Sequence, residues 1–128
     1  MVFGVFDRLH EGHRAFLAAA KKRGDTLIVV VARDSFVKEF KKKTPQWDKK
    51  KRLEEIRNVP EVDEGALADK IAGSYGVIKK CRPDIMCVGH DQSALEEDLK
   101  KRMASGKIRA LPIIRLPRYN REKNGHEN

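Results

Sequence analysis

The sequence predicts a single α/β domain, built on a parallel sheet of about five strands that is flanked by helices on both faces. The run at residues 26–32 is continuous, apolar and rich in β-branched side chains, as expected of a parallel strand that is buried on both faces. Segments with apolar residues at helical spacing alternate with such runs along the chain. A length of 128 residues is sufficient for one domain with its own core.

The first part of the chain is predicted to form two strands, each followed by a helical or mobile segment. A strand is expected over residues 1–6, and the next segment is helical until about Gly24, a typical residue for a helix end. Its apolar face consists of His13, Phe16, Leu17 and Ala20. The second strand, residues 26–32, ends at Arg33-Asp34. Residues 34–48 are rich in lysine and broken by Thr44-Pro45, which predicts a loop or short helix with a mobile connection, a candidate substrate lid.

Two helices are predicted next. Asp48 is a possible N-cap for the first of them, which continues through Ile56 and stops near Pro60. The second helix is expected where apolar residues recur at spacings of four and three, at Ile71, Tyr75 and Ile78. Both helices belong to the repeated strand–helix units of the α/β pattern.

The last elements complete a Rossmann-like domain. A strand is predicted at residues 85–88 and a final strand at residues 108–116. Between them lies an amphipathic helix marked by Leu95, Leu99 and Met103. We therefore expect the domain to occupy residues 1–118, and a polar C-terminal tail to occupy residues 119–128.

The composition favours an anionic partner but does not identify it. Lys and Arg total 28 against 19 Asp and Glu, which gives a formal charge of +9. This sign suits phosphate compounds or nucleic acid, although lysine runs such as 41–43 and 49–51 are usually solvated surface. No aromatic stripe, zinc spacing or helix-turn-helix pattern supports nucleic-acid binding, so no nucleic-acid partner is expected.

The cysteines and the hydropathy pattern predict a cytoplasmic, soluble protein. Cys81 and Cys87 have neither the spacing nor the number needed for a zinc site, and they are typical of a reducing compartment. No segment approaches the roughly 20 apolar residues that span a bilayer. We expect no membrane partner.

Two histidines at a strand-to-helix junction predict a phosphate site. His10 and His13 are separated by Glu11-Gly12 and follow the apolar run of the first strand. Imidazole can donate to phosphate oxygens, and the first turn of a helix offers unpaired N–H groups. Gly12 lets the backbone come close to a ligand. Asp91 follows the strand at 85–88, so it is expected at the same sheet edge, where ligands bind in open α/β sheets.

The residues around these histidines resemble a known family. Residues 4–13 read Gly-Val-Phe-Asp-Arg-Leu-His-Glu-Gly-His, which is similar to the G-x-F-D-x-x-H-x-G-H signature of the cytidylyltransferase-like nucleotidyltransferase superfamily. Residues 32–53, Arg82-Pro83-Asp84 and residues 89–92 look most like the archaeal-type FAD synthases. Leu116-Pro117-Arg118 also looks like the ending of the glycerol-3-phosphate cytidylyltransferases.

The resemblance implies transfer of a nucleoside monophosphate from a nucleoside triphosphate to a phosphorylated acceptor, with release of pyrophosphate. ATP and FMN giving FAD is the favoured reaction, and CTP with glycerol 3-phosphate or a similar phosphoalcohol is the alternative. Such chemistry needs positioning and charge stabilisation rather than a protein nucleophile. A divalent cation, Mg²⁺, is expected with the triphosphate and needs few protein ligands. Relatives of this size also suggest a homodimer.

The resemblance assigns roles residue by residue. His10, His13 and Lys41 are expected to be catalytic, the histidines at the triphosphate and the lysine at the phosphates of both substrates. Lys42 and Lys43 leave the register of that lysine open. The expected nucleotide-binding residues are Val5 and Phe6 through their backbone, Gly12, the two histidines, Asp91, Arg118 and Tyr119.

Other interpretations of the same residues remain open. Asp91 is expected to bind the ribose or the base edge, but it can also cap the helix that follows it. Asp34 and Arg52 are possible supports of the pocket, or an ordinary surface ion pair. The relatives continue after residue 118 with a Ser/Thr-bearing segment, whereas residues 119–125 have no serine or threonine, and position 90 is His where the FAD synthase pattern has Tyr.

Other classes of protein are also compatible with parts of the sequence. The class I aminoacyl-tRNA synthetases carry a similar histidine motif, but they need a second lysine motif and far more chain. A nucleotide- or nucleic-acid-binding protein without enzymatic activity would use the same histidines or the +9 charge. A member of the superfamily that binds nucleotide without turnover is the remaining alternative.

Overall fold

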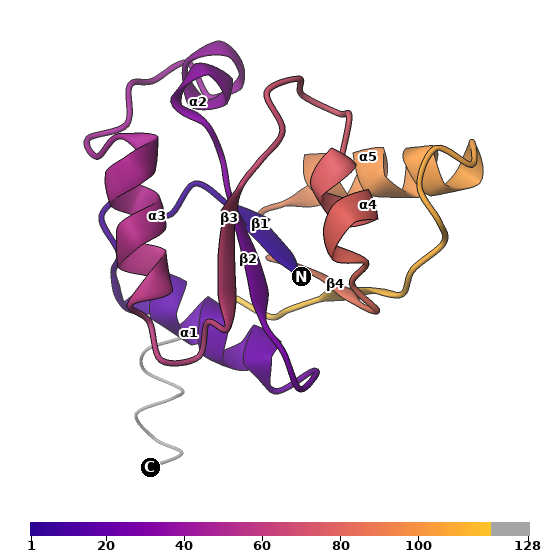
Figure 1. The fold of residues 1–128 in the computed structure, drawn as a ribbon, viewed down its shortest axis with the longest axis horizontal. Coiled ribbons are helices and arrows are strands. Elements are labelled where there is room, and N and C mark those ends of the chain that lie inside the picture. Colours follow the sequence, from indigo (N-terminus) through magenta and orange to yellow (C-terminus); the bar gives the residue numbers. More distant parts are fainter. Residues whose placement is uncertain (119–128) are drawn as a thin grey trace.

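The protein has an α/β fold in which every strand pair is parallel. The computed structural model describes residues 1–118, and all statements on structure below refer to that part of the chain. The elements in chain order are β1 (Val2–Gly4), α1 (Glu11–Lys21), β2 (Ile28–Val31), α2 (Asp34–Phe40), α3 (Lys49–Arg57), β3 (Glu64–Leu67), α4 (Gly76–Cys81), β4 (Met86–Val88), α5 (Ser93–Ala104) and β5 (Ile113–Arg115). Figure 1 shows the sheet between α1 and α3 on one side and α4 and α5 on the other.

The sheet differs in one respect from the expected single sheet of about five strands. Its pairing divides into a three-stranded part, β1-β2-β3, and a two-stranded part, β4-β5. Backbone hydrogen bonds of Met1 join the two parts, since the Met1 amino group donates to the Ile85 carbonyl (2.8 Å) and the Cys87 N–H donates to the Met1 carbonyl (3.0 Å). Strands β1 and β4 are therefore neighbours, although the pairing between them is too short to form a ladder.

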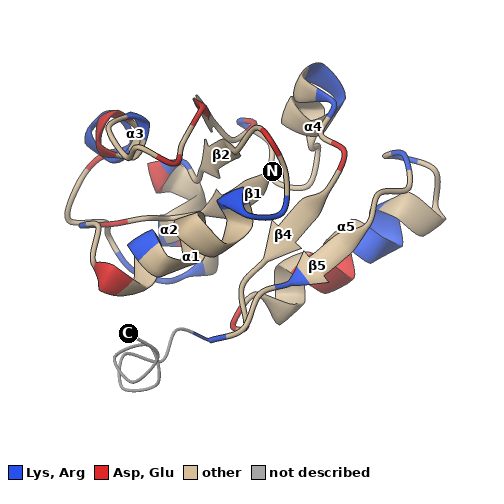
Figure 2. Ribbon diagram, turned by 90° about the horizontal axis from the view of Figure 1, so that it is seen from below, with Lys and Arg blue, Asp and Glu red and all other residues tan. Residues whose placement is uncertain are grey.

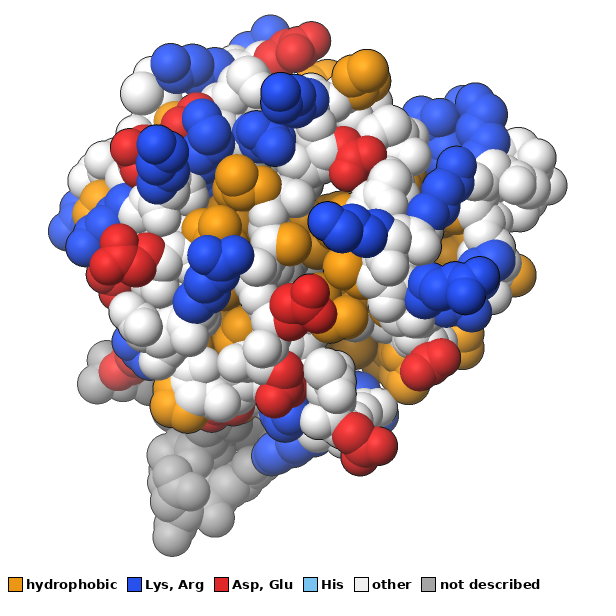
Figure 3. Space-filling view, viewed as in Figure 1, with side chains coloured by type: hydrophobic (Ala, Val, Ile, Leu, Met, Phe, Trp, Pro, Cys, Tyr) orange, Lys and Arg blue, Asp and Glu red, His pale blue; other side chains and the backbone are white. Residues whose placement is uncertain are grey.

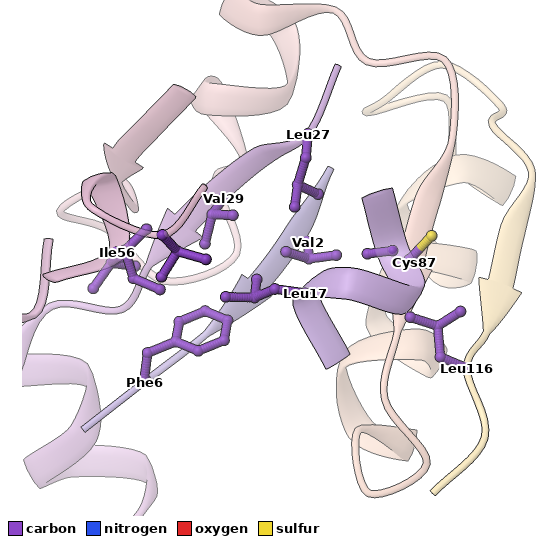
Figure 4. Close-up of a cluster of buried hydrophobic side chains, with 11 residues drawn as sticks. Val2, Phe6, Leu17, Leu27, Val29, Ile56, Cys87 and Leu116 are labelled. Atoms are coloured by element: carbon purple, nitrogen blue, oxygen red, sulfur yellow. The ribbon is translucent and has the colours of Figure 1, made fainter. Parts of the chain in front are cut away.

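Two hydrophobic clusters hold the layers together, one on each face of the sheet. Alternate residues of β2 serve the two clusters, because Val29 and Val31 pack with α1 and α3, while Val30 packs with α4 and α5. Figure 4 shows the first cluster, in which Phe6, Leu17 and Val2 gather beneath β2. This double coverage explains why the sequence of β2 is continuously apolar.

Two predictions about the elements are wrong in detail. The helix expected from Ile71 begins only at Gly76, and Ile71 is 74% exposed. The carboxylate of Asp69 accepts hydrogen bonds from the N–H groups of Gly76 and Val77, which fixes the start of the helix there. The last strand occupies only Ile113–Arg115 instead of 108–116. It starts just after Pro112, which has no N–H for a ladder.

β3 is an element that the sequence pattern does not predict. Its residues are Glu-Gly-Ala-Leu, without the β-branched or aromatic side chains that favour strands. Pairing with β2 over four residue pairs supplies its backbone partners. Gly65 also lies under α3, where an added Cβ would be 3.1 Å from Cγ of Arg57 and 3.3 Å from Cδ1 of Leu53. Tertiary contacts therefore determine this strand, and its own propensity does not.

Charged residues are spread over the molecule. Figure 2 shows Lys and Arg segments on several helices and connections, with Asp and Glu segments between them. Such interspersed charge is typical of a solvated surface and forms no single basic stripe on the described part of the chain. Within residues 1–118, no helix is both long enough and apolar enough to cross a membrane.

Candidate active site

The order of the strands places the candidate site at the carboxyl ends of β1 and β4. The chain runs outward from β1 through β2 to β3 and then crosses back to β4, which lies beside β1. Ligands of open α/β sheets bind at such a reversal of strand order. The loop after β1 leads to His10, and the loop after β4 carries Asp91, so the topology brings the two predicted segments to one edge.

The two histidine rings are stacked on each other. Their centroids are 3.8 Å apart, and their planes are inclined by 22°. His10 is the N-cap of α1, and His13 lies in the first turn of that helix. Both imidazoles therefore lie at the helix N-terminus, where the macrodipole favours an anion.

A hydrogen bond fixes the tautomer of His10. Its Nδ1 accepts the backbone N–H of Gly12 at 3.1 Å, so the proton of the neutral ring is on Nε2, and that N–H is the free donor. Gly12 has no side chain because an added Cβ would lie 2.9 Å from Cε1 of His10. The glycine is thus required by the position of the His10 ring.

His13 is held between His10 and the ring of Phe6. The Phe6 ring meets the His13 ring edge-on, with centroids 5.5 Å apart and an interplanar angle of 71°. Phe6 is buried and adopts a left-handed backbone conformation with φ of 53°. An added Cβ on Gly4 would be 2.6 Å from Cε2 of Phe6, so Gly4 makes room for that ring. The glycine and phenylalanine of the motif therefore position His13.

The environment of His13 keeps its ring neutral. Burial and the neighbouring charge of His10 lower the pKa of His13 from 6.5 to about 4, against the opposing influence of Asp7 and Asp91. Its Nδ1 is buried without a hydrogen-bond partner. A buried ring nitrogen without a hydrogen-bond partner lowers the stability of a folded protein. A bound anion beside it would raise this pKa again.

The segment after β4 is fixed by a side chain that the sequence prediction did not select. Gln92 accepts the N–H of Gly89 (2.8 Å) and donates to the carbonyl of Phe3 in β1 (2.8 Å). Asp91 lies beside this turn and is exposed, and its charge acts on His13. Asp91 itself is not the N-cap of α5, because that position is Gln92, whose side chain makes no cap bond. The capping interpretation of Asp91 is thus wrong.

The buried Arg52 and the partly exposed Asp34 support the loop after β1. Arg52 is fully buried and donates to the carbonyls of Trp47 (3.0 Å) and Val5 (2.8 Å) and to the Asp34 carboxylate (2.7 Å). Burial would raise the pKa of Asp34, but the hydrogen bonds from Arg52 and from the Lys49 N–H outweigh it and lower that pKa. The interpretation of this pair as ordinary surface ion pairing is therefore wrong.

Asp7 is a second support that the sequence prediction missed. Its carboxylate accepts the N–H groups of Gln46 (2.7 Å) and Trp47 (2.9 Å), and Arg8 donates to the Gln46 side chain (2.8 Å). The end of the lysine-rich segment is thereby attached to the histidine loop. The aspartate of the Gly-x-Phe-Asp motif was the available signal, because a carboxylate in a tight loop commonly binds backbone N–H groups.

The remaining predicted residues lie at the borders of the site. Lys41 is the exposed C-cap of α2, and Lys42 after it has a left-handed backbone with φ of 57°. Arg118 is exposed at the end of the described residues, and Tyr119 lies outside them. The lysine segment is attached to the histidine loop at its far end, where Gln46 and Trp47 donate to Asp7.

A hollow of about 500 Å³ lies elsewhere, along the open edge of β3. It is visible in Figure 3 between the α3 side and the α4 side, with hydrophobic side chains on its floor. Its lining includes Arg33 at the end of β2 but neither histidine. The hollow is separate from the strand reversal, so the chemistry of the histidine pair does not take place there.

A parallel α/β sheet with paired imidazoles at the first helix, next to the strand reversal, defines a nucleotide-binding α/β protein. The chain belongs to the cytidylyltransferase-like family, whose model matches residues 1–121. This family assignment makes the chain a nucleotidyltransferase and confirms the resemblance derived from residues 4–13.

Individual relatives agree with this assignment. The FAD synthase of Thermococcus sibiricus is 39% identical over 113 residues, 85% of this chain and 76% of that protein. The FAD synthase of Pyrococcus horikoshii is 38% identical over 117 residues, 91% of this chain and 78% of that protein. The crystal structure described as a lipopolysaccharide core biosynthesis protein from Thermoplasma volcanium has a TM-score of 0.84 and 36% identity, covering 94% of this chain and 96% of that one.

Proposed function

We propose that this protein transfers AMP from ATP to FMN, forming FAD and pyrophosphate. The observation that carries the proposal is the stacked pair of His10 and His13 at the start of α1, 3.8 Å between ring centroids. The FAD synthase relatives at 36–39% identity support ATP and FMN as the two substrates. The position of the pair at the reversal of strand order agrees with a nucleotide site.

The reaction needs positioning rather than covalent catalysis. A phosphate oxygen of FMN attacks the α-phosphorus of ATP, a new P–O bond forms, and the bond to the leaving pyrophosphate breaks. The electron pair of that bond stays on the pyrophosphate oxygen. No side chain has to form an intermediate, and the protein contributes by holding the groups in line and stabilising negative charge.

The histidines supply donors for that charge. The Nε2–H of His10 is free to donate because its Nδ1 is occupied by the Gly12 N–H. His13 is neutral in the free protein, since its pKa is about 4. A triphosphate beside it raises this pKa and so favours protonation of His13.

Other residues complete the proposed site. Lys41 reaches the phosphates of both substrates from the end of α2, and Asp91 binds the ribose or the base edge. The backbone of Val5 and Phe6 contacts the nucleotide from the loop that Arg52 holds at the Val5 carbonyl. Gly12 gives the backbone of α1 access to the phosphates. Arg118 contacts the nucleotide from the C-terminal end of the described residues.

A divalent cation, which we take to be Mg²⁺, accompanies the triphosphate and neutralises part of its charge. Within residues 1–118, no group of three or more His, Cys, Asp or Glu side chains is arranged to hold a metal ion. Mg²⁺ commonly keeps several waters and binds substrate phosphates. A cation that arrives with the nucleotide needs no such group of protein ligands.

We further propose a cytoplasmic homodimer. The open edge of β3 has strand β2 on one side only and carries the hollow of about 500 Å³. Exposed edge strands are sites at which another chain can pair. Light scattering of the purified protein measures this directly, and a monomer at every concentration would argue against the dimer.

The test of the activity is a matrix of pyrophosphate release. ATP and CTP are each supplied with FMN, glycerol 3-phosphate, phosphocholine, phosphoethanolamine or a sugar 1-phosphate. The expected result is release only with ATP and FMN together. Release with CTP and glycerol 3-phosphate would replace the proposal with a cytidylyltransferase. Nucleotide binding without release from any pair would indicate a protein that no longer turns over.

A further inference from the structure

Helix α2 carries two phenylalanine rings on one side, and one of them is open to solvent. Phe36 and Phe40 are one helical turn apart, with ring centroids separated by 4.8 Å and planes inclined by 31°. Phe40 is 53% exposed, whereas Val37 anchors the helix by its burial. The pair therefore presents an aromatic surface that no described side chain fully covers.

The neighbours of this surface distinguish it from a chance exposed residue. Single exposed hydrophobic residues are common on soluble proteins, and Ile71 is an example, with 74% exposure. Phe40 differs because three exposed lysines, residues 41–43, follow it directly. A flat apolar ring beside positive charge suits a ligand that has an aromatic ring system at one end and a phosphate at the other.

The chain connects this surface to the histidine loop at two points. At the start of α2, Asp34 binds Arg52, which in turn holds the Val5 carbonyl. After α2, the lysine segment returns to Gln46, whose N–H donates to Asp7. The stretch between Phe40 and Gln46 spans at most about 20 Å when fully extended. Figure 1 shows α2 beyond the end of β2.

We propose that Phe40, backed by Phe36, is the platform on which the ring system of the acceptor stacks. This inference rests on the proposed function, because FMN has an aromatic ring system joined through a flexible chain to a phosphate. In that arrangement, the lysines of residues 41–43 attract the phosphate and direct it toward His10 and His13. Phe40 is then a residue that determines acceptor specificity and takes no part in the bond changes.

The test uses the fluorescence anisotropy of FMN, which rises when the flavin binds to the much larger protein. FMN is titrated with the wild-type protein and with Phe40→Ala, Phe40→Leu, Phe40→Tyr and Ile71→Ala, the last as a control that removes the other large exposed hydrophobic side chain of the described residues. Loss of one stacking partner should weaken FMN binding about tenfold in Phe40→Ala and Phe40→Leu. Phe40→Tyr and Ile71→Ala should bind as the wild type does.

Steady-state kinetics separates this inference from the proposed function. In Phe40→Ala, the KM for FMN should rise about tenfold while the KM for ATP stays unchanged. Equal FMN affinity in the wild type and Phe40→Ala would overturn the platform, even if AMP transfer is normal. FMN binding that depends on Phe40 without any AMP transfer by the wild type would retain the platform and refute the proposed function. A change in dimerisation by Phe40→Ala, with FMN binding intact, would assign the surface to a second copy and overturn the inference.

Discussion

The neutral state of His13 should make the stability of the protein depend on pH in a defined range. The pKa of His13 is about 4 in the folded protein, against 6.5 for the unperturbed side chain. Between these values the unfolded chain binds a proton that the folded protein does not bind. The free energy of unfolding therefore falls as the pH drops from 6.5 to about 4, and this contribution is fully present above pH 6.5.

The size of the effect follows from the same two values. At about 1.4 kcal/mol for each pH unit between them, the contribution of His13 is at most about 3 kcal/mol. Partial exposure of the ring lowers this to about 2 kcal/mol. His13→Asn removes the titration while keeping an amide in place of the imidazole, so the variant should lack this part of the pH dependence.

The assay is urea unfolding of the wild type and His13→Asn at pH 7 and pH 4.5. Comparison of the two proteins cancels the titration of the carboxylates, which they share. The loss of unfolding free energy should be about 2 kcal/mol larger in the wild type, whereas the exposed-site control His90→Asn should follow the wild type. Parallel pH profiles for wild type and His13→Asn would show that the environment of His13 does not keep it neutral.

Further predictions concern the reaction, the buried support and the lysine segment. His10→Ala and His13→Ala should each reduce turnover by about a hundredfold or more with the fold intact, which is the scale for losing one electrostatic contact. Normal turnover in a folded variant would show that the histidine takes no part in the reaction. Asp34→Asn should lower the free energy of unfolding by about 3 kcal/mol because the fully buried Arg52 loses its charged partner. The control Glu55→Gln, which breaks the solvent-accessible Lys51–Glu55 pair, should cost much less, and equal losses in urea unfolding would contradict a special role of Arg52. Saturating ATP should protect the chain near Lys41 from trypsin, as measured by mass spectrometry of the fragments, and unchanged cleavage would argue against a lid.

Much of the fold could be predicted because its signals are local. The continuous apolar run of β2 and the N-cap at Asp48, whose side chain accepts the Lys51 N–H at 2.9 Å, depend on residues close in sequence. β3 could not be predicted, since pairing with β2 and packing under α3 determine it. The helical spacing of Ile71 with Tyr75 and Ile78 was misleading, because the side chain of Ile71 is exposed and does not contribute to the core.

The site shows the same division between local and distant interactions. The spacing of His10, Gly12 and His13 was visible in the sequence, and the structure explains the glycine by the contact that a Cβ would make with the His10 ring. The supports of the site are distant in sequence. Arg52 holds the Val5 carbonyl, and Gln92 joins β4 to β1. Only the folded chain shows which polar side chains are used in this way.

The most direct test of the account is the conversion of FMN to FAD with ATP, followed by chromatography of the flavins and parallel measurement of pyrophosphate. We expect equal amounts of FAD and pyrophosphate from the wild-type protein. We also expect at least a hundredfold slower formation by His13→Ala at the same protein concentration. No FAD from the wild type, or the same rate from His13→Ala, would contradict the claim that the stacked histidines form the site of AMP transfer.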